Sequence, residues 1–486
     1  MPLVVGIDSS TQSTKVEVRD VDTGEVRASG RHPHPATTPP RSEQDPQAWW
    51  EALVHAVRAS ELDSGDVVAM SVAGQQHGMV VLDDDGHVIR PAKLWNDTES
   101  AAEADALVVA LGAVAWAEAV GSVPLAAFTV SKVAWLKSHE PDNYARLSSL
   151  LLPHDWLTFI LTGRMTTDRG DASGTGYWSP GDGRWRPDLL RQIDAERDWS
   201  AALPRVLAPF ETAGVVGSTA AQALGFGSGT VLVGPGTGDN MAAALGMGLV
   251  PGDVVISLGT SGTVYAVSEA PTADATGAVA GFADATGRYL PLVCTLNAMK
   301  VTDAVARLLA VDHRSFEDLV LATPAGAEGL VLVPYFDGER TPNRPAATGL
   351  LAGLRSGVTR GQLARASVEG VVCGLLDGLE ALGAAGVPTT GRLFLIGGGS
   401  RSGAFRRVVA DLTGRNVHVP DADEHVATGA CLQAAAVWRA REGRPTDGLL
   451  SELTANWRLG GGTVVEPDMS VDRTAIRSSY RTARDR

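Results

Sequence analysis

The chain has 486 residues, of which 44% are hydrophobic and 20% charged, and its formal net charge is -15. One hydrophobic core organises roughly 250 to 300 residues, so this length predicts two domains. The negative charge argues against nucleic acid as a partner, and no apolar tract reaches the about 20 residues that a membrane-spanning helix needs.

The beginning of the chain, MPLVVGID, lacks the basic and apolar segments of a secretory signal, so we expect a cytoplasmic protein. Cysteine usage agrees with this expectation. The chain has three cysteines, Cys294, Cys373 and Cys431, which lie far apart in the sequence and are surrounded by apolar residues. They are predicted to be buried thiols rather than disulfides or zinc ligands.

Strand patterns alternate with helical ones along the chain. Strands are predicted at 67–74, 229–236, 253–260, 329–336 and 392–399, and amphipathic helices at 45–62 and 360–382. This alternation indicates an α/β protein with layered sheets. The Pro-rich stretch 336–349 is predicted to be a loop.

One pattern occurs twice. VVGIDSSTQSTKVEV (4–18) and VVISLGTSGTVYAV (254–267) both read as a strand, a turn of small and hydroxyl residues, and a second strand. The repeat favours a duplicated domain, although so short a similarity can also arise by chance. We expect a first domain over 1–248, a second over 249–440, and a terminal helix and tail over 441–486 attached to the second domain.

The first turn carries Asp8 before a run of hydroxyl residues and a lysine. Backbone N–H groups and hydroxyls in a tight turn can hold a polyphosphate, with Lys15 adding a charge. An aspartate beside phosphates is favourable when it holds Mg²⁺, which makes Asp8 a candidate metal residue. The alternative is an Asx turn at the end of a strand. Ser10 and Thr11 are the candidate ATP-binding hydroxyl residues.

The second turn replaces the aspartate with glycine. Gly259, Thr260 and Ser261 allow close backbone approach to phosphate, and a plain hairpin turn is the alternative. A later glycine turn follows the strand at 392–399, and we interpret it as a surface for adenosine or as a structural βα turn. Its residues are Gly397, Gly398, Gly399 and Ser400.

Two further stretches carry polar groups suited to catalysis and sugar binding. Asp239, in GTGDN before an alanine-rich helix, is either a helix N-cap or a carboxylate that accepts a proton from a substrate hydroxyl. Gln76 and His77 end one strand, and Trp95 and Asn96 follow in LWND. Such groups suit a polyhydroxylated ligand, although a lone histidine is often structural.

Taken in order, these motifs resemble the FGGY carbohydrate kinase family, within the superfamily that includes Hsp70 and actin. The resemblance covers about residues 3 to 440. The remaining motifs that carry it are LPHDWLTFILTG, DASGT, GERTPNRP and GLLAGLRSGVTRGQLARASVEG. It implies two duplicated ribonuclease H-like domains that flank a central cleft.

The resemblance also implies roles for matching residues. Asp239 corresponds to the general base and Asp8 to the carboxylate that organises Mg²⁺, while Gln76, His77 and Asn240 lie where family members contact the sugar. The expected reaction is phosphorylation of a ketopentose, D-xylulose, by ATP. Glycerol kinases carry an Arg-Glu pair in place of Gln76-His77, which disfavours glycerol. Members that act on xylulose commonly show GQMHG, where this chain has GQQHG.

Other readings remain open at this point. The acceptor could be another ketose or polyol, such as ribulose, gluconate or fuculose. The paired turns alone also fit an actin-like or Hsp70-like ATPase without a sugar substrate. An NAD-dependent oxidoreductase is disfavoured because the glycine turn lies late in the chain. Whether the chain forms a homodimer stays open.

Overall fold

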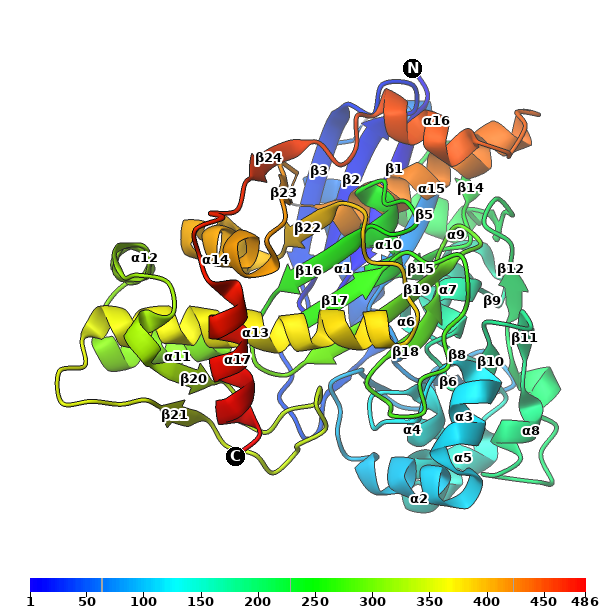
Figure 1. Cartoon of the computed structure of the whole chain (residues 1–486). Coiled ribbons are helices and arrows are strands. Elements are labelled where there is room, and N and C mark those ends of the chain that lie inside the picture. The colour runs from blue at the N-terminus through cyan, green and yellow to red at the C-terminus, as the bar shows by residue number, and fades with distance from the viewer. Residues whose placement is uncertain (63, 228, 423) are drawn as a thin grey trace.

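The computed structural model describes residues 1–62, 64–227, 229–422 and 424–486, and it contains two seven-stranded sheets (Figure 1). The first sheet has the order β13-β14-β5-β1-β2-β3, with β15 also paired to β5. Its strands are β13 (Gly214–Val215), β14 (Leu232–Val233), β5 (Val67–Gly74), β1 (Leu3–Ser9), β2 (Ser13–Asp20), β3 (Val26–Pro33) and β15 (Thr237–Gly238).

The second sheet has the order β18-β19-β17-β16-β22-β23-β24. Its strands are β18 (Ala280–Ala283), β19 (Tyr289–Thr295), β17 (Gly262–Ala266), β16 (Val254–Leu258), β22 (Leu393–Ile396), β23 (Val417–Pro420) and β24 (Gly462–Val465).

The two sheets share one pairing pattern. In the first, β1 pairs antiparallel with β2 and parallel with β5, and β2 pairs antiparallel with β3. In the second, β16 pairs antiparallel with β17 and parallel with β22, and β17 pairs antiparallel with β19. The repeated hairpin in the sequence therefore begins two sheets of the same topology, and the expected duplicated fold is confirmed.

Helices cover both faces of the first sheet. Val5 and Ile7 of β1 pack with Trp49 and Leu53 of α1 (Pro46–Ala59), whereas Val4 packs in the cluster that contains α15 (His425–Arg441). Successive side chains of a strand point to opposite faces, so β1 carries apolar side chains on both faces before it reaches Asp8. The helix α15 thus lies on the first sheet although it follows all strands of the second sheet except β24 in sequence.

The second sheet is covered by α13 (Arg360–Ala384) and α14 (Gly403–Thr413), which share a buried cluster with Val254 and Ile256. The N-terminus of α13 carries a capping box, in which Thr359 and Gln362 satisfy each other's backbone N–H groups. The other helices of this half are α11 (Met299–Leu309) and α12 (His313–Ala322).

The region between β5 and α10 (Asp239–Gly246) consists mainly of short elements. Its helices are α2 (Ala101–Leu111), α3 (Ala113–Val120), α4 (Thr129–His139), α5 (Pro141–Arg146), α6 (Pro153–Thr162), α7 (Arg169–Ala172), α8 (Pro187–Leu190) and α9 (Ser218–Leu224). Of these, α2, α3, α4, α5 and α8 lie at the lower right of Figure 1. Its strand pairs are β6 (Val80–Leu82) with β8 (Ser149–Leu151), β9 (Thr166–Asp168) with β12 (Arg205–Leu207), and β10 (Trp178–Ser179) with β11 (Arg184–Trp185). Its strand β7 (Ala92–Lys93) pairs with β4 (Glu43–Gln44), which precedes β5 in the chain.

The C-terminal region is more ordered than the predicted helix and tail. It contains α16 (Leu449–Asn456), the strand β24 at the edge of the second sheet, and α17 (Arg473–Arg484). Trp457, just after α16, donates a hydrogen bond to the carbonyl of Val21 in the first half. The region therefore contacts both halves of the molecule.

Three smaller predictions have clear outcomes. The stretch 336–349 is a loop between β20 (Val331–Val333) and β21 (Leu350–Ala352), as predicted. All three cysteines are buried and unpaired, as predicted. Among the described residues, no helix is both long enough and apolar enough to cross a lipid bilayer.

Candidate active site

The first candidate phosphate turn joins β1 to β2, with Asp8 opposite Lys15 in the antiparallel register. Asp8 is 2% exposed, and its carboxylate accepts a hydrogen bond of 2.6 Å from the Ser10 hydroxyl. Burial raises the pKa of Asp8, and Lys15 and Ser10 oppose that rise. Lys15 Nζ lies 2.6 Å from Glu424 Oε2 and 3.6 Å from Asp8 Oδ2, so two carboxylates already share its charge.

Thr11 connects this turn to the expected sugar-binding residues. Its hydroxyl accepts a hydrogen bond of 2.9 Å from Trp95 Nε1 and donates one of 3.2 Å to Gln75 Oε1. Its carbonyl accepts a further bond from Gln44 Nε2 at 3.0 Å. The tip of the turn is thereby held against the LWND segment.

The second turn also closes a hairpin, but it is one residue shorter than the first, since Leu258 pairs with Gly262 whereas Ser9 pairs with Thr14. Ser10 N–H donates to the Ser13 carbonyl at 3.1 Å, and Gly259 N–H donates to the Ser261 carbonyl at 3.0 Å. Gly397, with a φ of +83°, comes so close to β16 that a Cβ on it would lie 2.6 Å from the Leu258 carbonyl oxygen. The glycine turn after β22 is therefore adjacent to the second phosphate turn.

Two glycines set the path of the loop that carries Asp239. Gly236 has a φ of +77°, and a Cβ there would lie 2.5 Å from His154 Nδ1. A Cβ on Gly238 would lie 2.6 Å from Gln76 Cγ. Because β15 pairs with the end of β5, Asp239 emerges beside the Gln75-Gln76 segment. Only glycine permits so close an approach.

Asp239 is the first residue of α10 and not its N-cap, a position that Gly238 occupies. Its Oδ1 accepts hydrogen bonds from the backbone N–H of Asn240 at 2.8 Å and from Asn240 Nδ2 at 3.0 Å. Burial, followed by the negative charge of Asp8, raises the pKa of Asp239 to about 7. A carboxylate with a pKa near neutrality is well matched to accept a proton from an alcohol.

The predicted sugar-binding residues, apart from Asn96, line the same cavity as Asp239. Asn240 Nδ2 donates a hydrogen bond of 2.8 Å to Gln76 Oε1. His77 has a φ of +64°, and its ring packs against Phe128 at 5.0 Å and Phe282 at 5.3 Å. Burial, with smaller contributions from Lys132 and Arg340, lowers the pKa of His77 to about 3. His77 is therefore a neutral hydrogen-bonding group at physiological pH.

A cavity of about 270 Å³ joins these residues to both phosphate turns. Among the predicted site residues, its lining contains Thr11, Gln76, His77, Trp95, Asp239, Asn240, Gly259 and Ser261. The predicted residues outside this lining are Asp8, Ser10, Lys15, Asn96, Thr260 and the turn Gly397, Gly398, Gly399 and Ser400.

The cavity also has lining residues that were not predicted from the sequence as site residues: Ala127, Ser257, Thr263, Phe282, Leu292, Cys294 and Arg340. Arg340 belongs to the GERTP motif, which was the only local signal for it. Phe282 comes from β18 of the second half, so both halves of the molecule build this cavity.

A second cavity of about 410 Å³ lies beside the glycine turn after β22. Gly398 and Met299 both line it, and the Met299 N–H donates a hydrogen bond of 3.0 Å to the carbonyl of Gly259. Gly259 thus lies between the two cavities. The other lining residues are Thr302, His313, Arg314, Phe316, Glu317, Arg401, Ser402 and Phe405, none of which was predicted from the sequence.

A buried network of charged residues is hydrogen-bonded to the loop that carries Asp239. His154 Nε2 lies 3.1 Å from Asp155, 3.4 Å from Asp171 and 3.5 Å from Asp168. Thr237 Oγ1, in the loop itself, donates a hydrogen bond of 2.8 Å to Asp168 Oδ2. Burial disfavours the charge on His154, but the three carboxylates outweigh it and raise its pKa to about 9.

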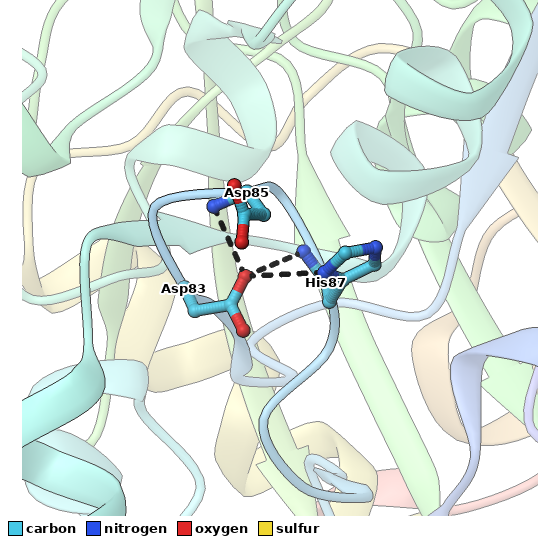
Figure 2. A group of neighbouring side chains, drawn as sticks. All are labelled: Asp83, Asp85 and His87. Atoms are coloured by element: carbon cyan, nitrogen blue, oxygen red, sulfur yellow. Dashed lines mark hydrogen bonds and ion pairs between the residues drawn. The ribbon is translucent and has the colours of Figure 1, made fainter.

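Two groups of acidic residues resemble metal ligands but lie outside the cavity. Figure 2 shows Asp83, Asp85 and His87 on one exposed turn, where Asp83 Oδ1 accepts the backbone N–H groups of the other two. Hydrogen bonding within the turn accounts for this group.

The second group is Glu43, Asp97 and Glu99. Lys93 Nζ lies 3.2 Å from Glu43, 3.1 Å from Asp97 and 2.5 Å from Glu99, so a lysine already forms ion pairs with all three carboxylates. Asp8, the predicted metal residue, belongs to neither group.

Comparisons with known proteins show the family of the chain. Models of the FGGY family of carbohydrate kinases match residues 3–246 with the N-terminal domain and residues 254–438 with the C-terminal domain. Xylulose kinase of Streptomyces rubiginosus is 47% identical over 466 residues, which cover 96% of this chain and 92% of that protein. Xylulose kinase of Haemophilus influenzae is 35% identical, covering 91% of each chain.

Among solved structures, xylulose kinase from Bifidobacterium adolescentis is similar with a TM-score of 0.87 and 42% identity, covering 99% of both chains. The matched family models together span most of the chain and include both phosphate turns and the Asp239 loop. This chain therefore belongs to the FGGY family of carbohydrate kinases.

Proposed function

We propose that the chain transfers the γ-phosphoryl group of ATP to O5 of D-xylulose, forming D-xylulose 5-phosphate and ADP. The observation that carries the proposal is the cavity in which Asp239, Gln76 and His77 face the second phosphate turn. Relatives named xylulose kinase support the choice of sugar.

In this mechanism the sugar lies among Gln76, His77, Trp95 and Asn240, with its terminal hydroxyl toward Asp239. The carboxylate of Asp239 accepts the hydroxyl proton as the oxygen attacks phosphorus. The bond between phosphorus and the β,γ-bridging oxygen breaks, and ADP leaves. Phosphoryl transfer depends mainly on such positioning and on stabilisation of charge.

The nucleotide is proposed to run from the cavity beside Gly398 to the cavity beside Asp239. Gly259 lies between the two, so its turn can hold the phosphates. The hydroxyls of Ser10 and Thr11 and the Ser261 turn would contact the triphosphate from opposite sides.

Mg²⁺ is proposed to bind beside Asp8. The Asp8 carboxylate is buried and accepts one hydrogen bond from Ser10, and its pKa is raised by burial, so a divalent cation would stabilise its charged form. The metal would supply charge neutralisation on the phosphates.

A coupled ADP-release assay tests the function with D-xylulose, D-ribulose, L-ribulose, glycerol, gluconate and L-fuculose. D-xylulose is expected to give the highest kcat/KM. Asp239→Asn should lower kcat by about 10²- to 10⁴-fold and leave nucleotide affinity unchanged. A higher kcat/KM for another sugar would refute the choice of substrate. ATP hydrolysis that sugars do not stimulate would favour the actin-like ATPase.

A further inference from the structure

The GERTP segment places Arg340 in the lining of the catalytic cavity. Glu339 is 3% exposed, and its Oε1 accepts the Leu296 N–H at 2.7 Å while its Oε2 accepts Asn297 Nδ2 at 2.9 Å. Thr341 Oγ1 donates a hydrogen bond of 3.0 Å to the Cys294 carbonyl. Both neighbours of Arg340 are thus tied to the end of β19.

Arg340 itself lines the cavity together with Asp239, Gly259 and Ser261. It is the only lysine or arginine among the lining residues of that cavity in the described part of the chain. Its charge reaches the interior, because it contributes to the lowered pKa of His77 and opposes the effect of burial on the pKa of Cys294.

The guanidinium of Arg340 has no carboxylate within ion-pair distance among the residues that the structure describes. Lys15 differs, because Glu424 and Asp8 both lie within ion-pair distance of it. A partly buried guanidinium without a carboxylate is a strong donor to phosphate oxygens, which it can bind with two parallel hydrogen bonds. Arg340 is therefore the cation available to an anion that enters this cavity.

We propose that the guanidinium of Arg340 donates hydrogen bonds to the non-bridging oxygens of the phosphoryl group while it passes from ATP to the acceptor. Arg340 gives up no proton in this step. The sugar oxygen forms its bond to phosphorus, the bond to the bridging oxygen of ADP breaks, and the hydroxyl proton goes to Asp239. The inference rests on the phosphoryl transfer proposed above, and it does not depend on which sugar is the acceptor.

Steady-state kinetics of Arg340→Gln, Arg340→Lys and Arg344→Gln test the assignment with the best acceptor of the sugar panel. Arg344 is the matched control, because it lies in the same loop, is exposed, and donates to the Arg484 carbonyl away from the cavity. Arg340→Gln should lower kcat by about 10²- to 10³-fold, the usual effect of losing a donor to transition-state charge. Arg340→Lys should recover part of that loss, and Arg344→Gln should stay within about twofold of wild type.

Separate values of kcat and KM distinguish a role of Arg340 in phosphoryl transfer from a role in sugar binding. A rise in the KM for sugar with kcat unchanged would overturn the proposal, because it would make Arg340 a sugar-binding residue. Equal losses of kcat in Arg340→Gln and Arg344→Gln would overturn it as well, because they would indicate damage to the loop.

A binding measurement keeps the test independent of the sugar. ADP with magnesium and aluminium fluoride imitates the phosphoryl group in transfer, and calorimetry or nucleotide fluorescence reports its affinity. Arg340→Gln should weaken that complex by at least tenfold and change the affinity for ADP alone by less than twofold. Equal affinities of wild type and Arg340→Gln for the fluoride complex would refute the role of Arg340, even if D-xylulose proves not to be the substrate.

Discussion

Asp239 is subject to two effects that raise its pKa, burial and the nearby charge of Asp8, and to hydrogen bonds from Asn240 that lower it. The balance places the pKa at about 7, several units above that of an exposed aspartate. A general base acts only when it is deprotonated, so this balance has a direct kinetic consequence.

We expect kcat/KM to fall as the pH drops below about 7, by about tenfold per pH unit, and to level off above that value. The complex of Mg²⁺ with ATP keeps a net negative charge, which would raise the pKa of Asp239 further, so the midpoint for kcat should lie at higher pH. Rate measurements between pH 5.5 and pH 8.5 check both midpoints. A kcat/KM that stays flat across this range would contradict the assignment of Asp239 as the base.

Asp239 and Arg340 show which site residues could be predicted from the sequence and which could not. Asp239 was predicted because its signal is local: small residues, an aspartate and then a helix. Arg340 was not, because its place depends on the hydrogen bond that its neighbour Glu339 accepts from the N–H of Leu296, a residue 43 positions before Glu339. His154 was missed for the same reason, since the carboxylates around it meet only in the folded protein.

At the scale of elements, the strand β18 fixes the second half to the sugar side of the first. The Ala283 N–H donates a hydrogen bond of 2.9 Å to Ser173 Oγ, and the Gly281 N–H donates one of 2.9 Å to the Gly121 carbonyl. Ser173 Oγ in turn donates to the Gly170 carbonyl at 2.6 Å. The DASGT motif, for which the sequence suggested no role, thus provides a docking point for β18.

Replacing Ser173 with alanine should leave the Ala283 N–H buried without a partner. The expected loss of unfolding free energy is about 1–3 kcal/mol, and the KM for sugar should rise because Phe282 lies next to Ala283 and lines the cavity. Urea denaturation and steady-state kinetics measure the two effects. Ser138→Ala is a suitable control, because Ser138 is exposed and bonds only within α4. Equal stability of the two variants would argue against a docking role for Ser173.

The hairpins were predictable because alternation within a strand and small residues in a turn are both local features. The position of α15 was not, because its sequence is rich in alanine and buried along much of its length, so either sheet could have accepted it. The strand β24 was also missed. It lies at the edge of the second sheet, and most of its residues are exposed, so it lacks a clear apolar pattern.

At the scale of the whole molecule, two crossing helices join the halves. A Cβ on Gly429 of α15 would lie 1.9 Å from the carbonyl oxygen of Ala242 in α10, and a Cβ on Gly246 would lie 2.1 Å from the carbonyl oxygen of His425. The helix α10 begins at Asp239, so this crossing holds the candidate base. This close backbone contact is one place where a movement of one half relative to the other would be felt at α10.

The two halves are expected to close over sugar and nucleotide together, because both contribute residues to the cavity and closure would exclude water from the phosphoryl group. Small-angle scattering should show a smaller radius of gyration for wild type with D-xylulose and a non-hydrolysable ATP analogue. Gly429→Ala has to separate α10 from α15, so it should reduce this compaction and lower kcat by about 10²-fold, the typical cost of misplacing a reacting group by about 1 Å.

Gly383→Ala in α13 is the matched control, because it is also a helical glycine but has no atom within 4 Å of the added Cβ. It should stabilise the helix by about 1 kcal/mol and leave compaction and kcat unchanged. Full compaction in Gly429→Ala, or none in wild type with both ligands bound, would show that the crossing of α10 and α15 does not govern closure. Loss of kcat in Gly429→Ala with full compaction would instead assign the crossing to the placement of Asp239 alone.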